Sequence, residues 1–264
     1  MSERAAAVEI HGVSRHFRTP EGGLYQALAD IQLSVRAGSF VSLVGPSGCG
    51  KSTLLNIIAG LLAADRGRVE IFGRPLSGIN RRAAYMFQQD ALLPWKTVTE
   101  NIALGLELRG VVAGEARARA AEWIERVGLR HFGGSYPFQL SGGMRKRAAM
   151  AQVFITDPDI LLMDEPFGAL DVHTRQRMET EALALWSGTS KTVIFVTHDL
   201  EEAIALSDEV VILSAGPGSH VIGRHAIPLA RPRNLIDIRT DADFAEIYRA
   251  LWSSLRQEVL RTRV

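Results

Sequence analysis

A glycine-rich stretch has the residue types and the spacing of a phosphate-binding loop. Residues 45–53 read GPSGCGKST and match the pattern G-x-x-x-x-G-K-[ST], between a predicted strand and a predicted helix. The glycines let successive backbone N–H groups point into one concavity, and the helix start adds positive potential. Lys51 would contribute a point charge for β and γ phosphates, and Ser52 a hydroxyl for Mg²⁺. The predicted phosphate-binding residues are Gly45, Pro46, Ser47, Gly48, Cys49, Gly50, Lys51, Ser52 and Thr53.

A second candidate is an apolar run that ends in two acids. Residues 160–165 read ILLMDE, which is typical of a buried strand with carboxylates at its end. Next to a phosphate loop, Asp164 would lie on the Mg²⁺ side and Glu165 would be the general base that polarises a water. Taken alone, the pattern also fits a strand that ends in two solvated acids.

A third segment, residues 140–144, reads LSGGM and opens a predicted helix. Ser141 is a good N-cap, and Gly142 and Gly143 leave backbone N–H groups uncovered, so this helix start is a second candidate anion site. A glycine-rich cap without a ligand is the alternative. One nucleotide has no obvious need for two such sites in one subunit.

Length and composition restrict the class of protein. The chain has 264 residues, 47% of them hydrophobic, which fits one large globular domain or a core with a smaller lobe. The formal net charge of +1 gives no overall attraction to nucleic acid or to anionic lipid. The single cysteine, Cys49, excludes an intramolecular disulfide, fits a reducing compartment and is interpreted as filler within the loop. Residues 54–64 are too short to span a membrane, and the N-terminus lacks the apolar core of a signal peptide.

The hydrophobic pattern predicts an α/β fold: a P-loop core with a mainly parallel sheet, an antiparallel β subdomain and a helical subdomain. Residues 8–44 look like an antiparallel β start, and the last third alternates strands and helices. The helix after the glycine loop is predicted over residues 51–62. We expect one domain over residues 1–240, with its helical subdomain at about 90–155, and a helical tail over 241–264.

Together these segments resemble the nucleotide-binding subunits of ABC transporters. The resemblance includes the glycine loop, LSGGM, ILLMDEP, GALD at residues 168–171 and His198 in VTHD, in that order. It implies an ATP- and Mg²⁺-dependent ATPase that works as a head-to-tail homodimer. In that dimer the LSGGM segment of one subunit, with Ser141, Gly142 and Gly143, closes on the ATP held by the other.

The resemblance also implies roles for single residues. Gln88 matches the glutamine that senses Mg²⁺ and the attacking water, with Gln89 as the neighbouring alternative, and His198 matches a histidine that contacts the γ-phosphate. Asp171 matches an acid that communicates across the dimer. Phe17 falls where the family places an aromatic that stacks on adenine; Tyr25 is the runner-up, and a core role for Phe17 stays open. The implied catalytic residues are Glu165, His198 and Gln88, and the implied metal ligands are Ser52, Gln88 and Asp164.

The chain departs from many relatives at Met144, where glutamine is common, and at Gln152, where arginine is frequent. Neither change removes a phosphate donor. A finer resemblance, carried by QQDALLPWKTVTENIALGL and DEPFGALD, points to importers of nitrate, sulfonates, taurine and related small anions. It implies a peripheral subunit on the cytoplasmic face of the membrane, with permease subunits and an extracytoplasmic solute-binding protein as partners and no nucleic acid.

Two other classes of protein are alternatives. The first is a soluble ABC-type ATPase acting on DNA or ribosomes, which would carry a long coiled coil or a second cassette. The second is a P-loop small-molecule kinase, whose activity would not require the LSGGM and GALD segments. The apolar residues 92–95, which include Trp95, lie in a loop and are expected to be covered by something. The resemblance implies that part of them lines a groove for a short helix of the permease, and packing onto the subunit's own helical lobe is the alternative.

Overall fold

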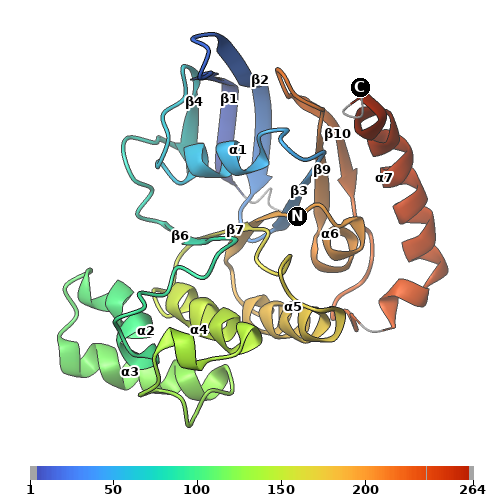
Figure 1. The fold of residues 1–264 in the computed structure, drawn as a ribbon. Coiled ribbons are helices and arrows are strands. Elements are labelled where there is room, and N and C mark those ends of the chain that lie inside the picture. Colours follow the sequence, from blue (N-terminus) through green and yellow to red (C-terminus); the bar gives the residue numbers. More distant parts are fainter. Residues whose placement is uncertain (1–4, 236, 262–264) are drawn as a thin grey trace.

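The computed structural model describes residues 5–235 and 237–261, and its strands form two sheets (Figure 1). The first has the order β2-β1-β4-β5 and is antiparallel. Its strands are β1 (Ala6–Arg18), β2 (Leu24–Arg36), β4 (Arg66–Ile71) and β5 (Arg74–Pro75). The second has the order β10-β9-β3-β8-β7-β6 and is parallel except for β10 at one edge. Its strands are β3 (Phe40–Val44), β6 (Ala83–Met86), β7 (Ile160–Asp164), β8 (Thr192–Val196), β9 (Glu209–Leu213) and β10 (Val221–Ala226).

The central strands β3, β7 and β8 of the parallel sheet are buried on both faces, which explains their nearly continuous apolar sequences. Every residue of β3, β7 and β8 is buried. Because successive side chains of a strand point to opposite faces, Leu161 and Met163 enter one core cluster and Ile160 and Leu162 the other. β3 is therefore not part of the antiparallel start expected over residues 8–44, because it pairs in parallel with β8 and β9.

The helix after the glycine loop, α1 (Lys51–Ile58), packs between the two sheets and is shorter than predicted. The apolar pattern continues to Leu62, but Gly60 has a left-handed φ of 71°. A Cβ at Gly60 would lie 1.9 Å from the carbonyl oxygen of Gly78. The chain therefore turns away at Gly60, and only glycine fits this close approach.

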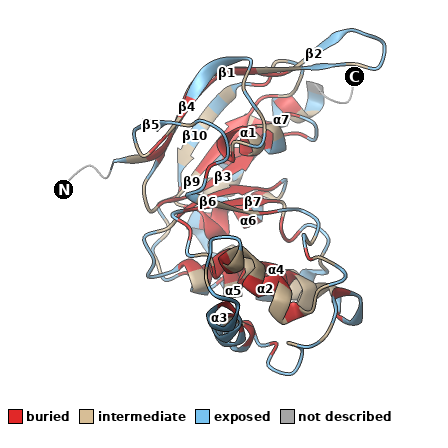
Figure 2. Cartoon of the chain, turned by 90° about the vertical axis from the view of Figure 1, so that its left-hand side faces the viewer, coloured by how far each residue is buried: buried red, intermediate tan, exposed pale blue. Residues whose placement is uncertain are grey.

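The remaining helices cover the opposite face of the parallel sheet and one end of it (Figure 1). Helices α2 and α3 lie with α4 in a lobe beside β6. The helical subdomain expected at about 90–155 includes these helices, and its bounds stay a prediction. Figure 2 shows that the buried residues of these helices face one another while the outer side of α3 is exposed. The helices are α2 (Val98–Glu107), α3 (Ala113–Arg126), α4 (Gly142–Phe154), α5 (Val172–Trp186), α6 (Leu200–Leu206) and α7 (Ala242–Arg261), with short 3-10 turns at Pro137–Gln139 and Ile238–Thr240.

The C-terminal helix α7 packs onto the core rather than standing apart from it. Phe244, Leu251 and Leu255 are buried in the same cluster as the helices under the parallel sheet. The expected boundary after residue 240 coincides with the end of a 3-10 turn, and the division of the chain into units stays a prediction. Residues 1–4 and 262–264 of the expected units lie outside the described residues. Within the described part of the chain, no helix has the length and apolarity that crossing a membrane requires.

Candidate functional site

Four of the predicted site segments meet because they follow neighbouring parallel strands. The glycine loop follows β3, Gln88 comes shortly after β6, Glu165 directly follows β7, and His198 comes shortly after β8. These strands are adjacent in the order β3-β8-β7-β6, and the carboxyl ends of parallel strands lie at one edge of a sheet. Segments separated by more than a hundred residues in the sequence therefore form one site.

The glycine loop wraps around the ammonium group of Lys51. The Lys51 Nζ donates to the carbonyl oxygens of Gly45 at 2.9 Å and Pro46 at 3.0 Å. Gly50, which precedes α1, has a left-handed φ of 89°. This conformation turns the chain sharply into the helix, so that the first N–H groups of α1 face the loop. The loop thus has the concave shape expected for phosphate binding.

Ser52 and Asp164 are joined at the mouth of this loop. The Ser52 Oγ donates to Asp164 Oδ1 at 2.9 Å, and the Tyr85 hydroxyl donates to Asp164 Oδ2 at 3.2 Å. Burial is the main cause that raises the pKa of the Asp164 carboxyl, and the two hydrogen bonds oppose it. Burial followed by the nearby Asp164 charge raises the pKa of the Tyr85 phenol, so Tyr85 stays a hydrogen-bond donor at neutral pH.

Glu165 is held between two other predicted catalytic side chains. Its Oε2 lies 3.2 Å from His198 Nδ1 and 3.5 Å from Gln88 Nε2. Glu165 has a φ of 42°, a left-handed conformation that costs a non-glycine residue about 1–3 kcal/mol and is often found at functional sites. This turn directs the carboxylate away from β7 and toward the other two residues.

The two candidates for contact with a nucleotide base lie directly opposite each other. Phe17 pairs with Tyr25 across β1 and β2, and each is 37% exposed. The Tyr25 hydroxyl is also 3.4 Å from the carbonyl oxygen of Gly48. Both rings line a pocket of about 320 Å³, with the loop at its floor. The complete lining is Phe17, Tyr25, Ala27, Ser47, Gly48, Gly50, Lys51, Ser52, Thr53, Gln88 and Glu165.

The LSGGM segment does not line the pocket that contains the glycine loop. Ser141, Gly142, Gly143 and Asp171 line a separate pocket of about 440 Å³ that shares no lining residue with the first. The Ser141 Oγ accepts from the Met144 N–H at 3.3 Å and so caps α4, as predicted from the sequence. The Asp171 carboxylate accepts from Thr174, which lowers its pKa and caps α5. Within one chain the two candidate anion sites are therefore distinct.

Cys49 is buried and does not line the pocket formed by Phe17, Tyr25 and the glycine loop. Its thiol is 3.7 Å from Lys51 Nζ, and burial is the main cause that raises the pKa of the thiol. A neutral, buried thiol is a poor nucleophile. These observations agree with the interpretation of Cys49 as filler.

Sequence reasoning missed Tyr85, although a signal for it exists. Tyr85 lies inside a predicted strand and pairs with Leu162 in the register of β6 and β7. Two positions further along β7 comes the acid Asp164. A polar aromatic residue in the strand beside an acid-terminated strand could have indicated a hydrogen bond to that acid.

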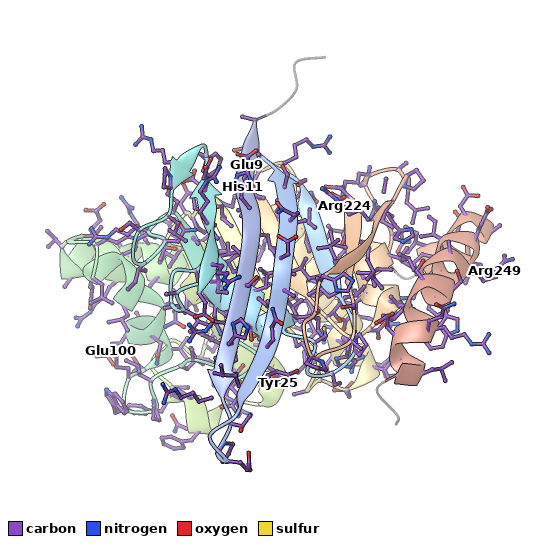
Figure 3. All side chains as sticks on the ribbon, turned by 90° about the horizontal axis from the view of Figure 1, so that it is seen from above. Glu9, His11, Tyr25, Glu100, Arg224 and Arg249 are labelled. Atoms are coloured by element: carbon purple, nitrogen blue, oxygen red, sulfur yellow. The ribbon has the colours of Figure 1, made fainter. Side chains whose placement is uncertain are left out.

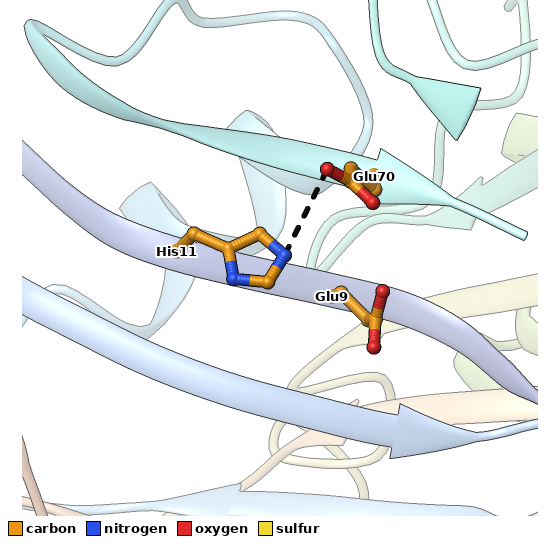
Figure 4. A group of neighbouring side chains, drawn as sticks. All are labelled: Glu9, His11 and Glu70. Carbon is orange, nitrogen blue, oxygen red and sulfur yellow. Dashed lines mark ion pairs between the residues drawn. The ribbon is translucent and has the colours of Figure 1, made fainter. Parts of the chain in front are cut away.

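A second group of metal-ligand residue types lies on the outer face of the antiparallel sheet. Glu9, His11 and Glu70 bring their ligand atoms within 4.8 Å of one another (Figure 4). Figure 3 shows His11 and Tyr25 toward opposite ends of the β1–β2 hairpin, so this group is remote from the nucleotide pocket. The guanidinium of Arg68 donates to Glu70 at 2.9 Å, so a cation of the chain already pairs with this carboxylate, and we assign no metal to the group.

Comparison with known proteins decides the family. A family model described as ABC transporter matches residues 28–168, which contain the glycine loop, LSGGM and the two acids at the end of β7, Asp164 and Glu165. This chain belongs to the ABC transporter family. As expected from the sequence, the ABC subunit is an ATPase with the fold of an ATP-binding cassette.

Relatives of this ABC subunit align over most of its length. The taurine import ATP-binding protein TauB of Jannaschia sp. is 39% identical over 95% of this chain and 91% of that protein. The aliphatic sulfonates import ATP-binding protein SsuB of Bacillus cereus is 43% identical over 86% of this chain and 89% of that protein. A dimeric post-hydrolysis structure of the ATP-binding cassette MJ0796 with ADP and Pi matches with a TM-score of 0.75 and 32% identity, over 84% of this chain and 100% of that one.

Proposed function

We propose that this ABC ATPase powers the import of a small anion of the nitrate, sulfonate or taurine class through a separate membrane permease. The observation that carries the proposal is the set of relatives named for taurine or aliphatic sulfonate import, which align over at least 85% of this chain. The subunit itself would not touch the solute. These relatives do not favour the alternative of a soluble ATPase acting on DNA or ribosomes.

The residues at the mouth of the glycine loop fit a Mg²⁺ ion bound with ATP. Ser52 and Asp164 offer oxygen ligands, and Gln88 adds an amide oxygen, which is the ligand type that Mg²⁺ prefers. The Ser52 Oγ and Asp164 Oδ1 are hydrogen-bonded at 2.9 Å, so both oxygens would be close enough to hold the same ion. When bound, the ion would neutralise charge on the β and γ phosphates.

The pocket residues, together with His198 beside the pocket, have separate roles in ATP binding and hydrolysis. Lys51 exchanges its contacts with loop carbonyls for contacts with phosphate oxygens, and Phe17 or Tyr25 stacks on the base. Glu165 accepts a proton from the attacking water. His198, held against Glu165, stabilises the γ-phosphate, and Gln88 senses the metal and the water.

A head-to-tail homodimer would bring the two separate pockets together. The glycine loop of one subunit would face Ser141, Gly142 and Gly143 of the partner subunit. Asp171 would be in contact across the interface. The solved relative MJ0796 supports the formation of a dimer, because its structures are described as dimeric. ATP binding would close the dimer, and hydrolysis would open it.

The subunit would act at the cytoplasmic face of the membrane, bound to permease subunits, with an extracytoplasmic solute-binding protein that delivers the solute. The experiment that tests this proposal is reconstitution. Permease and binding protein encoded beside this gene are co-expressed with the subunit, placed in proteoliposomes and supplied with radiolabelled taurine, an alkanesulfonate or nitrate.

We expect uptake of one of these anions that needs ATP at the subunit's side and is lost with Glu165→Gln. Calorimetry on the binding protein alone identifies which anion is recognised. ATPase activity that DNA or ribosomes stimulate, together with no association with the permease, would contradict the proposal.

A further inference from the structure

A nearly fully buried lysine connects two parts of the site. It lies on α4, the helix that begins at LSGGM and is called the signature helix here, and it contacts residues 87–90 around Gln88, called the glutamine segment here. Lys146 lies in the second turn of α4 and its side chain is only 5% exposed. Its Nζ donates to the backbone carbonyl oxygen of Gln88 at 2.7 Å and pairs with Asp90 Oδ1 at 3.0 Å. Burial of a charge is costly unless it is paired and hydrogen-bonded, so both partners are needed to keep this ammonium inside.

Further polar contacts connect Asp90 to Leu140, the first residue of the LSGGM segment. Asp90 Oδ2 also accepts from Arg145 Nε at 3.3 Å, and another guanidinium nitrogen of Arg145 donates to the carbonyl oxygen of Leu140 at 2.7 Å. Leu140 directly precedes Ser141. Polar contacts therefore run without a gap from the backbone of Gln88 to the residue before the N-cap of α4.

Neither Lys146 nor Arg145 lines the nucleotide pocket or the LSGGM pocket. Lys146 cannot act on ATP directly, but it fixes the backbone on which the Gln88 side chain is mounted. Lys146 contacts the backbone of Gln88, and the side chain of the same residue reaches Glu165, with 3.5 Å between Gln88 Nε2 and Glu165 Oε2. A displacement of Gln88 would therefore be passed to α4 through a short, hydrogen-bonded connection.

We propose that Lys146 is a positioning residue that makes the glutamine segment and the start of the signature helix move as one unit. Occupation of the Mg²⁺ site would move Gln88, and Lys146 with Asp90 would carry Ser141 toward the partner's ATP. The inference rests on the proposed roles of Gln88 and Ser141.

Two substitutions test it, with a matched control. Lys146→Met keeps length and removes the charge, and Lys146→Arg keeps the charge and should restore function in part. Lys191→Met is the control, because Lys191 also pairs with a carboxylate, Asp157, and donates to a carbonyl oxygen, that of Pro158 at 3.2 Å, but lies at the opposite end of β8. If Lys146→Met fails to fold, Asp90→Asn weakens the same connection with a smaller change.

The first readout is kinetic. For Lys146→Met we expect ATP affinity without Mg²⁺ to be unchanged, while the Mg²⁺ concentration for half-maximal hydrolysis rises about tenfold, as for loss of outer-shell support of a metal ligand. Lys191→Met should leave both values unchanged. A uniform loss of activity with an unchanged Mg²⁺ requirement would show a merely structural role and overturn the inference.

The second readout does not depend on turnover. Hydrogen exchange is followed in residues 87–90 and 139–145 with ATP, with and without Mg²⁺, at a protein concentration too low for dimers. In the unmodified chain Mg²⁺ should change exchange in both segments, and in Lys146→Met only in residues 87–90. If Lys146→Met keeps the response in residues 139–145, the inference is wrong while the role of Gln88 stands. If the unmodified chain shows no response in residues 87–90, the proposed role of Gln88 is wrong, and the inference falls with it.

Discussion

The carboxylate of Glu165 lies 3.2 Å from Nδ1 of His198, and this contact joins the end of β7 to the loop after β8. The Gln88 amide approaches the same carboxylate oxygen from the end of β6. A side chain that contacts residues from two neighbouring strands has little freedom to turn away. Glu165 is therefore held in one orientation by its neighbours, as its proposed role as general base requires.

Glu165→Gln should bind Mg-ATP and hydrolyse it about 10²–10⁴ times more slowly, because glutamine keeps the shape and the hydrogen bonds but cannot accept the proton. The variant should accumulate as a closed dimer. Phosphate release measures the rate, and size-exclusion chromatography with ATP detects the dimer. Near-normal turnover by the purified variant would exclude Glu165 as the base.

Lys51→Ala should lose ATP affinity as well as activity. The ammonium that now binds two loop carbonyls would contact phosphates in the ground state and in the transition state, so its removal weakens both. Titration with a fluorescent ATP analogue measures the affinity, and Lys191→Ala serves as the control for loss of a lysine elsewhere. An affinity equal to that of the control would argue against phosphate contact by Lys51.

Ser141→Arg should bind ATP as a monomer and fail to hydrolyse it, because arginine would fill the pocket in which the partner's ATP is expected. Mixed with an equal amount of Lys51→Ala, it should form heterodimers with one intact composite site and one site broken on both sides. Partial recovery of ATPase activity is the expected result. No recovery, with heterodimers shown to be present, would favour sites formed within one chain.

Trp95→Ala should weaken association with the permease and spare the isolated subunit. Trp95 is 70% exposed, whereas Leu92 is buried in the core of the helical lobe, so packing onto the subunit's own lobe holds for Leu92. Loss of an aromatic anchor at an interface costs about 2 kcal/mol or more, while an exposed site changes stability by about 0.5 kcal/mol or less. Co-purification and thermal unfolding measure the two effects. A loss of stability typical of a buried aromatic would place Trp95 in the core.

Glu179, buried in α5, should make folding stability fall as pH rises through the mildly acidic range. Burial, with the nearby charges of Glu202 and Asp199, raises the pKa of Glu179 to about 7, and the guanidinium groups of Arg239 and Arg175 oppose the rise. Between pH 4.5 and about 7 the unfolded chain releases this proton and the native chain keeps it, which favours unfolding by up to about 3 kcal/mol. Denaturant unfolding at several pH values measures the slope.

Glu179→Gln is the matched variant for that measurement, because it mimics the protonated side chain. Its stability relative to the unmodified chain should increase steadily from about pH 5 to about pH 8. A constant difference between the two proteins across this range would show that Glu179 is ionised in the native state.

The order of strands and helices was predictable because the apolar pattern of each buried strand is continuous and because residues typical of N-caps precede the helices. Ser141 and Asp171 cap α4 and α5 through side-chain oxygens, and Glu165 follows β7 directly. The end of α1 was not predictable from its apolar pattern. It depends on the approach of Gly78 to Gly60, a contact between segments whose packing no local pattern specifies.

The glycine loop and the acids were identifiable in the sequence because their chemistry requires fixed residue types at fixed spacing. Lys146 was not identifiable, since it acts through the backbone of Gln88, a partner distant in the sequence. Tyr85 was missed, although its place in the strand beside the acid-terminated strand β7 offered a signal for its hydrogen bond to Asp164. The choice between Phe17 and Tyr25 also stays open, because pairing across β1 and β2 places both rings at the same pocket.

The burial of Cys49 has a practical consequence for spectroscopy. Its thiol is the only one in the chain, and burial keeps it neutral, so maleimide and spin-label reagents should react slowly with the native protein. Cysteines introduced on the surface can then be labelled selectively without first replacing Cys49 inside the phosphate loop. Opening and closing of the dimer can thus be followed by fluorescence transfer or by electron spin resonance in a subunit whose nucleotide site is unaltered.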